Sequence, residues 1–175
     1  MGRRFDPYRS LAAVGVDFYV DAVDQELLGY YDDARRVVMV ARGLRQVERR
    51  STAAHEYVHA VRRDEPGCTE WHERKQELAV ARTAARLLIP VDDLVRALVW
   101  STDAAEVAEE LWVDLDTLAH RLAALGPDER RVIQQALRGA CAVGDEEGGN
   151  SAPGNDEQAV RANAAGPAGC ERAER

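Results

Sequence analysis

AAHEYVHAV, residues 53–61, places two histidines four positions apart, with a glutamate directly after the first. On an α-helix, residues four apart lie one turn above each other on nearly the same face, so the imidazoles of His55 and His59 can reach one metal ion. Glu56 lies one step around the helix, where a general base can take a proton from a water molecule on the metal. The residue types and their spacing predict a zinc site for hydrolysis.

The residues around this motif recur with a helical period. The first expected helix starts near Leu44 and ends before the breaker run DEPG at residues 64–67. A second helix is expected from about Trp71 to Ile89, because Pro90 disfavours helix in the residue before it. Small or apolar side chains form a stripe along the first helix: Val47, Ser51, Ala54, Val58 and Val61.

The motif also arises by chance or survives in decayed sites, so a third ligand is needed as support. A catalytic zinc takes three protein ligands and leaves one position open for water. Side chains of the right kind follow in the connecting loop and the second helix: Asp64, Glu65, Cys68, Glu70, His72, Glu73 and Glu77.

Glu77 is the preferred third ligand among them. It lies in a stripe of otherwise small or apolar residues that includes Ala81, and a carboxylate in a packed face is costly without a partner. Glu73, one turn nearer the solvated start of the helix, is the alternative. His72 fits a surface or capping role better, and a thiolate at Cys68 could close the site from the loop.

Three short segments before the motif are rich in β-branched or aromatic residues and predict strands: Val16–Val20, Glu26–Tyr31 and Arg35–Ala41. Asp32, Asp33 and Ala34 form a turn-like break between the last two. We therefore expect a small antiparallel sheet and, with the helices, an α+β fold.

Short helices are expected after Pro90, over Val91–Trp100, Ala104–Leu111 and Leu115–Leu125, with a last one, ERRVIQQAL, after Asp128. From Gly139 onward, the sequence is rich in Gly, Ala, Asn and acidic residues and has no hydrophobic period. Such a segment buries too little apolar surface to offset the entropy of ordering, so residues 139–175 are expected to be a disordered tail.

Ala108–Leu122, AEELWVDLDTLAHRL, has the outline of a helix-turn-helix. Its second helix offers only His120 and Arg121 as positive or switchable groups, within acidic surroundings. Phosphate contacts supply most of the attraction in DNA binding, so we expect a packing or partner-docking role rather than direct nucleic-acid binding. Trp100 and Trp112 are interpreted as core anchors.

Composition points to one folded unit with a tail. The chain has 175 residues, a formal net charge of -8 and three scattered cysteines. The net negative charge disfavours binding to nucleic acid or an anionic membrane. No apolar run approaches the roughly 18 residues of a membrane span, and the cysteines fit a reducing compartment. We expect a cytoplasmic protein.

The motif pair HEYVHA (His55–Ala60) and RKQELAVARTAARLLIP (Arg74–Pro90) resembles the ImmA/IrrE family of small metallo-endopeptidases, particularly versions from actinobacteria and their phages. The similarity runs from the strands near Val16 through the short helices after Pro90. It implies a zincin-like metallopeptidase core of the minimal gluzincin type with one Zn²⁺ per chain. The expected organisation is this core at residues 1–90, a helical region packed on it at 91–138, and the tail at 139–175.

The resemblance also implies roles for individual residues. His55, His59 and Glu77 are the implied metal ligands and Glu56 is the implied base. Arg35–Ala41 is implied to be an edge strand that aligns the substrate main chain by strand addition.

One position departs from the family pattern. Four residues after the ligand glutamate, where the family usually has Asp or Asn to orient a metal-binding histidine, this chain has Ala81. Loss of such a partner typically costs about 10–100-fold in metal affinity or activity. Glu73 and Arg82 are the candidates to replace it. For the oxyanion, the side chains to inspect are Tyr57 and His120.

Three functions remain open from the sequence. The first is a zinc-dependent endopeptidase acting on a protein; the resemblance implies a helix-turn-helix repressor in phage or mobile-element regulation as its target. The second is a non-catalytic regulatory module with the zincin fold, which holds a repressor or DNA without cleaving it. In the third, zinc mainly holds two helices together. The cleavage site, the trigger and the oligomeric state are not determined by the sequence.

Overall fold

The computed structural model describes residues 4–22, 27–63 and 69–144. In these ranges the chain forms an α+β fold with seven helices and a three-stranded sheet, which confirms the expected fold class. The elements in chain order are α1 (Pro7–Ala13), β1 (Asp17–Asp21), β2 (Gly29–Asp32), β3 (Val37–Ala41), α2 (Gln46–Arg62), α3 (Glu70–Leu88), α4 (Val91–Trp100), α5 (Ala104–Leu111), α6 (Leu115–Ala123) and α7 (Pro127–Gly144).

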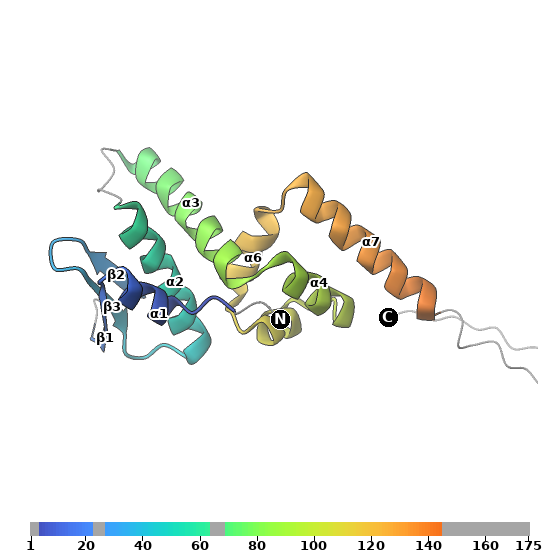
Figure 1. Cartoon of the computed structure of the whole chain (residues 1–175), viewed down its shortest axis with the longest axis horizontal. Coiled ribbons are helices and arrows are strands. Elements are labelled where there is room, and N and C mark those ends of the chain that lie inside the picture. The colour runs from blue at the N-terminus through green and yellow to red at the C-terminus, as the bar shows by residue number, and fades with distance from the viewer. Residues whose placement is uncertain (1–3, 23–26, 64–68, 145–175) are drawn as a thin grey trace, which may run out of the picture.

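Figure 1 shows these elements arranged in a row. The sheet lies at one end, α2 and α3 follow side by side, and α4 and α7 lie at the other end. Helix α1 packs against α2 and β1, and α6 packs against α3. None of the helices within the described ranges is long and apolar enough to cross a membrane.

The sheet is mixed, whereas a purely antiparallel sheet was expected. Its order is β1-β3-β2: β2 and β3 form an antiparallel hairpin, and β1 pairs with the other side of β3 in parallel. The expectation that Arg35–Ala41 forms an edge strand was therefore wrong, because β3 has a neighbour on both sides. Its apolar residues at every position, with Val38 and Val40 fully buried, suit a central strand.

Helix α1 was not predicted. Its signals are nevertheless present, because the side chain of Asp6 accepts hydrogen bonds from the backbone N–H groups of Tyr8 and Arg9, and Pro7 occupies the first turn. Leu11 is fully buried beneath α2, so this short helix closes one side of the small core around the sheet.

Helix α2 has two packed faces. Ala53 and Ala60 join a core cluster with the sheet, which includes Val38 and Val40. Ala54 and Val58 face α3 instead, where Val80, Ala84 and Leu88 complete the contact. The small residues on both helices allow a close approach. Val61, expected to continue the apolar stripe, is 53% exposed and lies beyond this contact at the end of α2.

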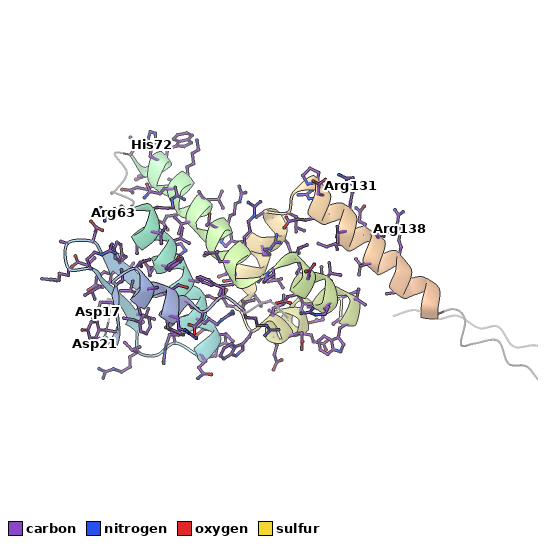
Figure 2. The ribbon with its side chains drawn as sticks, viewed as in Figure 1. Asp17, Asp21, Arg63, His72, Arg131 and Arg138 are labelled. Carbon is purple, nitrogen blue, oxygen red and sulfur yellow. The ribbon has the colours of Figure 1, made fainter. Side chains whose placement is uncertain are left out.

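The helices after Pro90 follow the sequence expectations closely, and Asp103 and Asp114 cap α5 and α6 with their side chains. Helix α7 is longer than expected, because it begins at Pro127 and continues to Gly144, into the predicted tail. The rest of that tail, residues 145–175, lies outside the described residues. Figure 2 shows Arg131 and Arg138 pointing away from the body along α7.

One core cluster joins α2 and α3 to the helices after Pro90, through residues such as Leu94, Leu111 and Leu118. The division of the chain at residue 90 stays a prediction. Trp100 and Trp112 were wrongly expected to be core anchors, because they are 64% and 47% exposed. The core positions nearby are filled by smaller aliphatic side chains.

Two buried arginines fix α6 relative to α2 and α3. The Arg50 guanidinium, on α2, donates to the carbonyl of Trp112 at 2.9 Å and lies over its indole ring. Arg121, only 2% exposed on α6, donates to the carbonyl of Ile89 at 2.8 Å and pairs with Glu129 at 2.6 Å. Charged groups are buried only where such partners exist, so these contacts set where α6 lies.

Candidate metal centre

The two histidines of the central motif face the same point from α2. The Nε2 atoms of His55 and His59 lie 3.1 Å apart, and the side chains are 27% and 15% exposed. Their four-residue separation on a regular helix produces this convergence directly.

Glu77 reaches the same point from α3. Its Oε2 lies 3.0 Å from His55 Nε2, and its Oε1 lies 3.4 Å from His59 Nε2. The expectation that Glu77 is buried in a packed face was wrong, however, because its side chain is 55% exposed. Glu77 is near the histidines because α2 and α3 pack closely through their small residues.

These three side chains fit a divalent metal ion. Their donor atoms lie within 4.8 Å of one another, and no other such group of His, Cys, Asp and Glu occurs in the described ranges. Ligands of a tetrahedral zinc are roughly 3.2–3.6 Å apart, close to the distances found here. Imidazole nitrogens and carboxylate oxygens are also donor types that zinc binds in proteins. A tetrahedral zinc ion held by these three side chains would keep one position for water or substrate.

Glu56 lies beside this group and is buried, with 7% exposure. Burial raises the pKa of its carboxyl group to about 8, and the charge of Glu77 acts in the same direction. A backbone hydrogen bond from Tyr31 in β2 opposes both effects. The carboxyl group is thus held between the sheet and the group formed by His55, His59 and Glu77.

The imidazole of His55 is adapted to ligation. Burial lowers its pKa, and the neighbouring His59 and more distant His120 act in the same direction, while Glu77 opposes them. A lowered pKa favours the neutral imidazole, which is the form that binds metal.

An open cleft of about 1340 Å³ leads to the three ligands. Its walls come from β2, the cleft-facing side of α2, α3 and the N-terminal part of α6. Pockets for small molecules are usually about 300–1,000 Å³, so this cleft is large enough for a segment of polypeptide.

The other ligand candidates are distributed differently. Glu73 lines the cleft one turn before Glu77. His72 is exposed at the start of α3, where its Nδ1 lies 2.8 Å from Thr69 Oγ1, and Figure 2 shows it at the tip of the helix. Glu70 pairs with Arg74 on the surface. Asp64, Glu65 and Cys68 lie outside the described residues.

Ala81 also lines the cleft, so the departure from the family pattern faces the site. Of the two candidates to replace the missing polar group, Glu73 is in the cleft wall and Arg82 is exposed. Of the two oxyanion candidates, His120 lines the cleft, whereas Tyr57 packs against Phe5 with ring centroids 5.4 Å apart. His120 is therefore the better placed of the pair.

Sequence reasoning missed the contribution of β2. Gly29 lets this strand approach α2, because a Cβ atom there would lie 2.7 Å from Thr52 Cγ2 and 2.8 Å from the carbonyl oxygen of Met39. This approach brings Tyr31 to Glu56. A glycine at a strand end is a weak signal for close packing, since turns use glycine as often.

The comparisons with known proteins agree with this arrangement. The family model Peptidase_M78, described as the IrrE N-terminal-like domain, matches residues 15–123. The match spans the three strands, α2, α3 and α4 to α6. Neither the curated proteins nor the solved structures include a significant match.

Proposed function

Because the chain belongs to the Peptidase_M78 family, a family of metallopeptidase type, we propose that it is a zinc-dependent endopeptidase that hydrolyses a peptide bond of a protein substrate. The observation that carries the proposal is the convergence of His55, His59 and Glu77 within 4.8 Å at the floor of an open cleft. Buried Glu56 directly beside them supports a catalytic rather than a purely structural site.

Each side chain then has a defined task. His55, His59 and Glu77 would hold a zinc ion, which supplies a Lewis acid that polarises the scissile carbonyl and lowers the pKa of a water molecule. Glu56 accepts the proton of the attacking water and passes it to the leaving amine. His120, from the opposite wall, is the group we assign to the developing oxyanion.

The edge strand that aligns the substrate is β2 in this proposal. The carbonyl of Leu28 accepts from Ala41 N in β3, so the backbone groups of the next residue, Gly29, face away from the sheet. Strand β2 also lines the cleft. An extended substrate segment could therefore pair with β2 and lie across the metal site.

The proposed target is a helix-turn-helix repressor in phage or mobile-element regulation, an assignment that rests on the family resemblance alone. Direct binding to nucleic acid is not part of the proposal. In a DNA-binding helix-turn-helix, α6 would be the recognition helix. Its Arg121 is buried and paired with Glu129, which argues against contacts with DNA phosphates.

A second candidate is the non-catalytic module that holds its partner without cutting. Ala81 favours it, since this side chain has no polar atom to orient a metal-binding histidine. The two proposals differ in what happens to a bound repressor.

The deciding experiment incubates the zinc-loaded protein with a helix-turn-helix repressor from the same genome, with and without a chelator, followed by gel and mass analysis. We expect the wild-type protein to produce repressor fragments, and these should be absent when a chelator is added. They should also be absent with Glu56→Gln, a variant that should still retain zinc. Glu109→Gln, on the exposed surface of α5, is the matched control and should cleave normally. An intact complex of repressor and wild-type protein would support the non-catalytic module. Cleavage by Glu56→Gln at the wild-type rate would show that Glu56 is not the general base.

A further inference from the structure

The cleft has a strong bias in charge. Of the nine Asp, Glu, Arg and Lys residues that line it, eight are acidic and only Arg45 is basic. Two of the eight, Glu56 and Glu77, belong to the metal centre. The remaining six decide what kind of substrate the cleft attracts.

Three of the six are neutralised by neighbouring arginines. Asp32 and Asp33 pair with Arg35 and Arg36 at 3.4 and 3.6 Å in the turn after β2. Glu48 pairs with Arg45 at 2.7 Å at the start of α2. These carboxylates contribute little net charge to the cleft.

The other three have no ion-pair partner in the part of the chain that the structure describes, and they share the wall formed by α3 and α6. We call Glu73, Asp114 and Asp116 the acidic wall. Glu73 is exposed one turn before Glu77, and Asp116 is exposed one turn before His120. Asp114 accepts from Thr117 N at 2.7 Å as the cap of α6, and its charge acts on Arg45 although the two side chains form no direct ion pair.

Part of the opposite wall is apolar. On the β2 side, Leu28 and Tyr30 are 61% and 40% exposed and line the same cleft. The floor also contains a hydrogen-bonding group without a partner: Ser51, 7% exposed one turn before His55, has a buried hydroxyl that makes no hydrogen bond within the described residues. A buried hydroxyl without a hydrogen-bond partner is unfavourable, so it points to a ligand that supplies one.

The acidic wall does not form a second metal site, because His55, His59 and Glu77 are the only metal-holding group in the described ranges. Its charges are spread along two helices, an arrangement that suits several separated cations rather than one ion. Building on the proposed peptidase function, we infer that the cleft selects an extended protein segment whose arginine or lysine side chains face Glu73, Asp114 and Asp116 while its apolar side chains face β2.

The expected size of the effect follows from exposed ion pairs. Each is worth about 0.2–1 kcal/mol, which is about 1.5- to 5-fold in affinity. Such factors multiply, so two pairs of middle strength, at about 2- to 4-fold each, should together give a preference of roughly 4- to 16-fold for a basic over a neutral segment, and salt should reduce it.

The test measures binding and cleavage separately. The probes are two dye-labelled ten-residue peptides with the same Leu-Phe centre, one carrying arginine at the flanking positions and the other citrulline, a neutral group of nearly the same shape. Fluorescence anisotropy with the zinc-loaded full chain carrying Glu56→Gln gives affinities without turnover. Wild-type protein gives kcat/KM for both peptides.

At low salt, we expect the arginine peptide to bind more tightly than the citrulline peptide by the fold-preference given above. At 0.5 M salt, the difference in affinity between the two peptides should be smaller. Adding Glu73→Gln and Asp116→Asn should reduce the preference to about 3-fold or less, while Glu109→Gln with Glu110→Gln, exposed on α5 outside the cleft, should leave it unchanged. Circular dichroism checks that each variant is folded.

Equal affinity for the two peptides, no measurable binding of the arginine peptide, or a preference that survives loss of Glu73 and Asp116 overturns the inference. Failure of the proposed function looks different: binding keeps its preference for arginine, but the wild-type protein cuts neither peptide nor the repressor. Cleavage without any preference for the arginine peptide would support the peptidase function and contradict only the inference about the acidic wall.

Discussion

Glu56 and Glu77 show how two glutamates of one cleft are given different properties by their surroundings. Glu56 is 7% exposed and its pKa is raised to about 8 by burial. Glu77, with a side chain that is 55% exposed, keeps contact with solvent while its oxygens face both imidazoles. Burial thus sets the proton affinity of Glu56, whereas Glu77 is placed to contact both imidazoles.

The raised pKa of Glu56 predicts a pH-dependent stability for the metal-free protein. Between about pH 4.5 and 8 the folded state retains a proton that the unfolded chain has lost, so the free energy of unfolding should fall as pH rises through this window, by an amount on the order of a few kcal/mol. Urea denaturation at several pH values measures it.

Glu56→Gln is the control for that dependence, since its amide does not titrate. The difference between the two proteins isolates Glu56 from the histidines, because both proteins share His55 and His59. Parallel stability curves for the two proteins from pH 4.5 to 8 would contradict the prediction.

Glu77→Ala should lower zinc affinity by more than the roughly 10–100-fold that loss of an outer-shell partner costs, because it removes one of three ligands. Zinc content after dialysis against a competing chelator, measured by mass spectrometry, tests this. Glu70→Ala, on the exposed first turn of α3, should keep its metal. Metal retained in Glu77→Ala but lost in Glu73→Ala would transfer the ligand role to Glu73.

Among the elements, β2 depends most on a single close contact. This short strand contacts α2 where Gly29 meets Thr52, and the same approach brings Tyr31 to Glu56. Helix α6, which has the outline of a recognition helix in sequence, serves here as a cleft wall with His120 and Asp116. The function of both elements comes from what they pack against.

Gly29→Ala should lower the free energy of unfolding by about 1–3 kcal/mol, because the added methyl group meets the Met39 carbonyl and the Thr52 side chain at under 3 Å. Gly43→Ala is the matched control, since a Cβ at that position has no neighbour within 4 Å, and it should cost no stability. Urea denaturation compares the two. Equal stability of both variants would mean that β2 does not need the close approach.

Across the whole molecule, the core is independent of the metal ligands. Two clusters of buried aliphatic side chains hold the fold together, and His55, His59 and Glu77 are members of neither. One of these clusters also extends from α2 and α3 through the helices after Pro90. The site is thus carried on a scaffold with its own source of stability.

Removal of zinc should therefore lower the melting temperature without unfolding the chain at 25 °C. A metal present at 100 times its dissociation constant adds about 2.7 kcal/mol, which corresponds to about 5–11 °C in Tm for a chain of this size. Circular dichroism with and without chelator measures both quantities. Collapse of the helical signal on chelation would instead assign zinc a mainly structural role.

The sequence by itself determined the local features of this protein. The helical period placed His55 and His59 on one face of α2, and residue spacing together with Pro90 placed α3 and α4 within a residue or two. Asp6 as a capping residue and Pro7 after it are also sequence signals for the start of α1, a helix that was not predicted. These features depend on neighbours a few positions apart, which the chain order specifies directly.

The tertiary structure decided which segments lie side by side. It placed β3 rather than β2 in the centre of the sheet, left Trp100 and Trp112 on the surface, buried Glu56 instead of Glu77, and turned α6 towards the cleft. Strand order and burial depend on contacts between residues distant in the chain. Since many arrangements satisfy the same local pattern, only the packing of the whole core selects one of them.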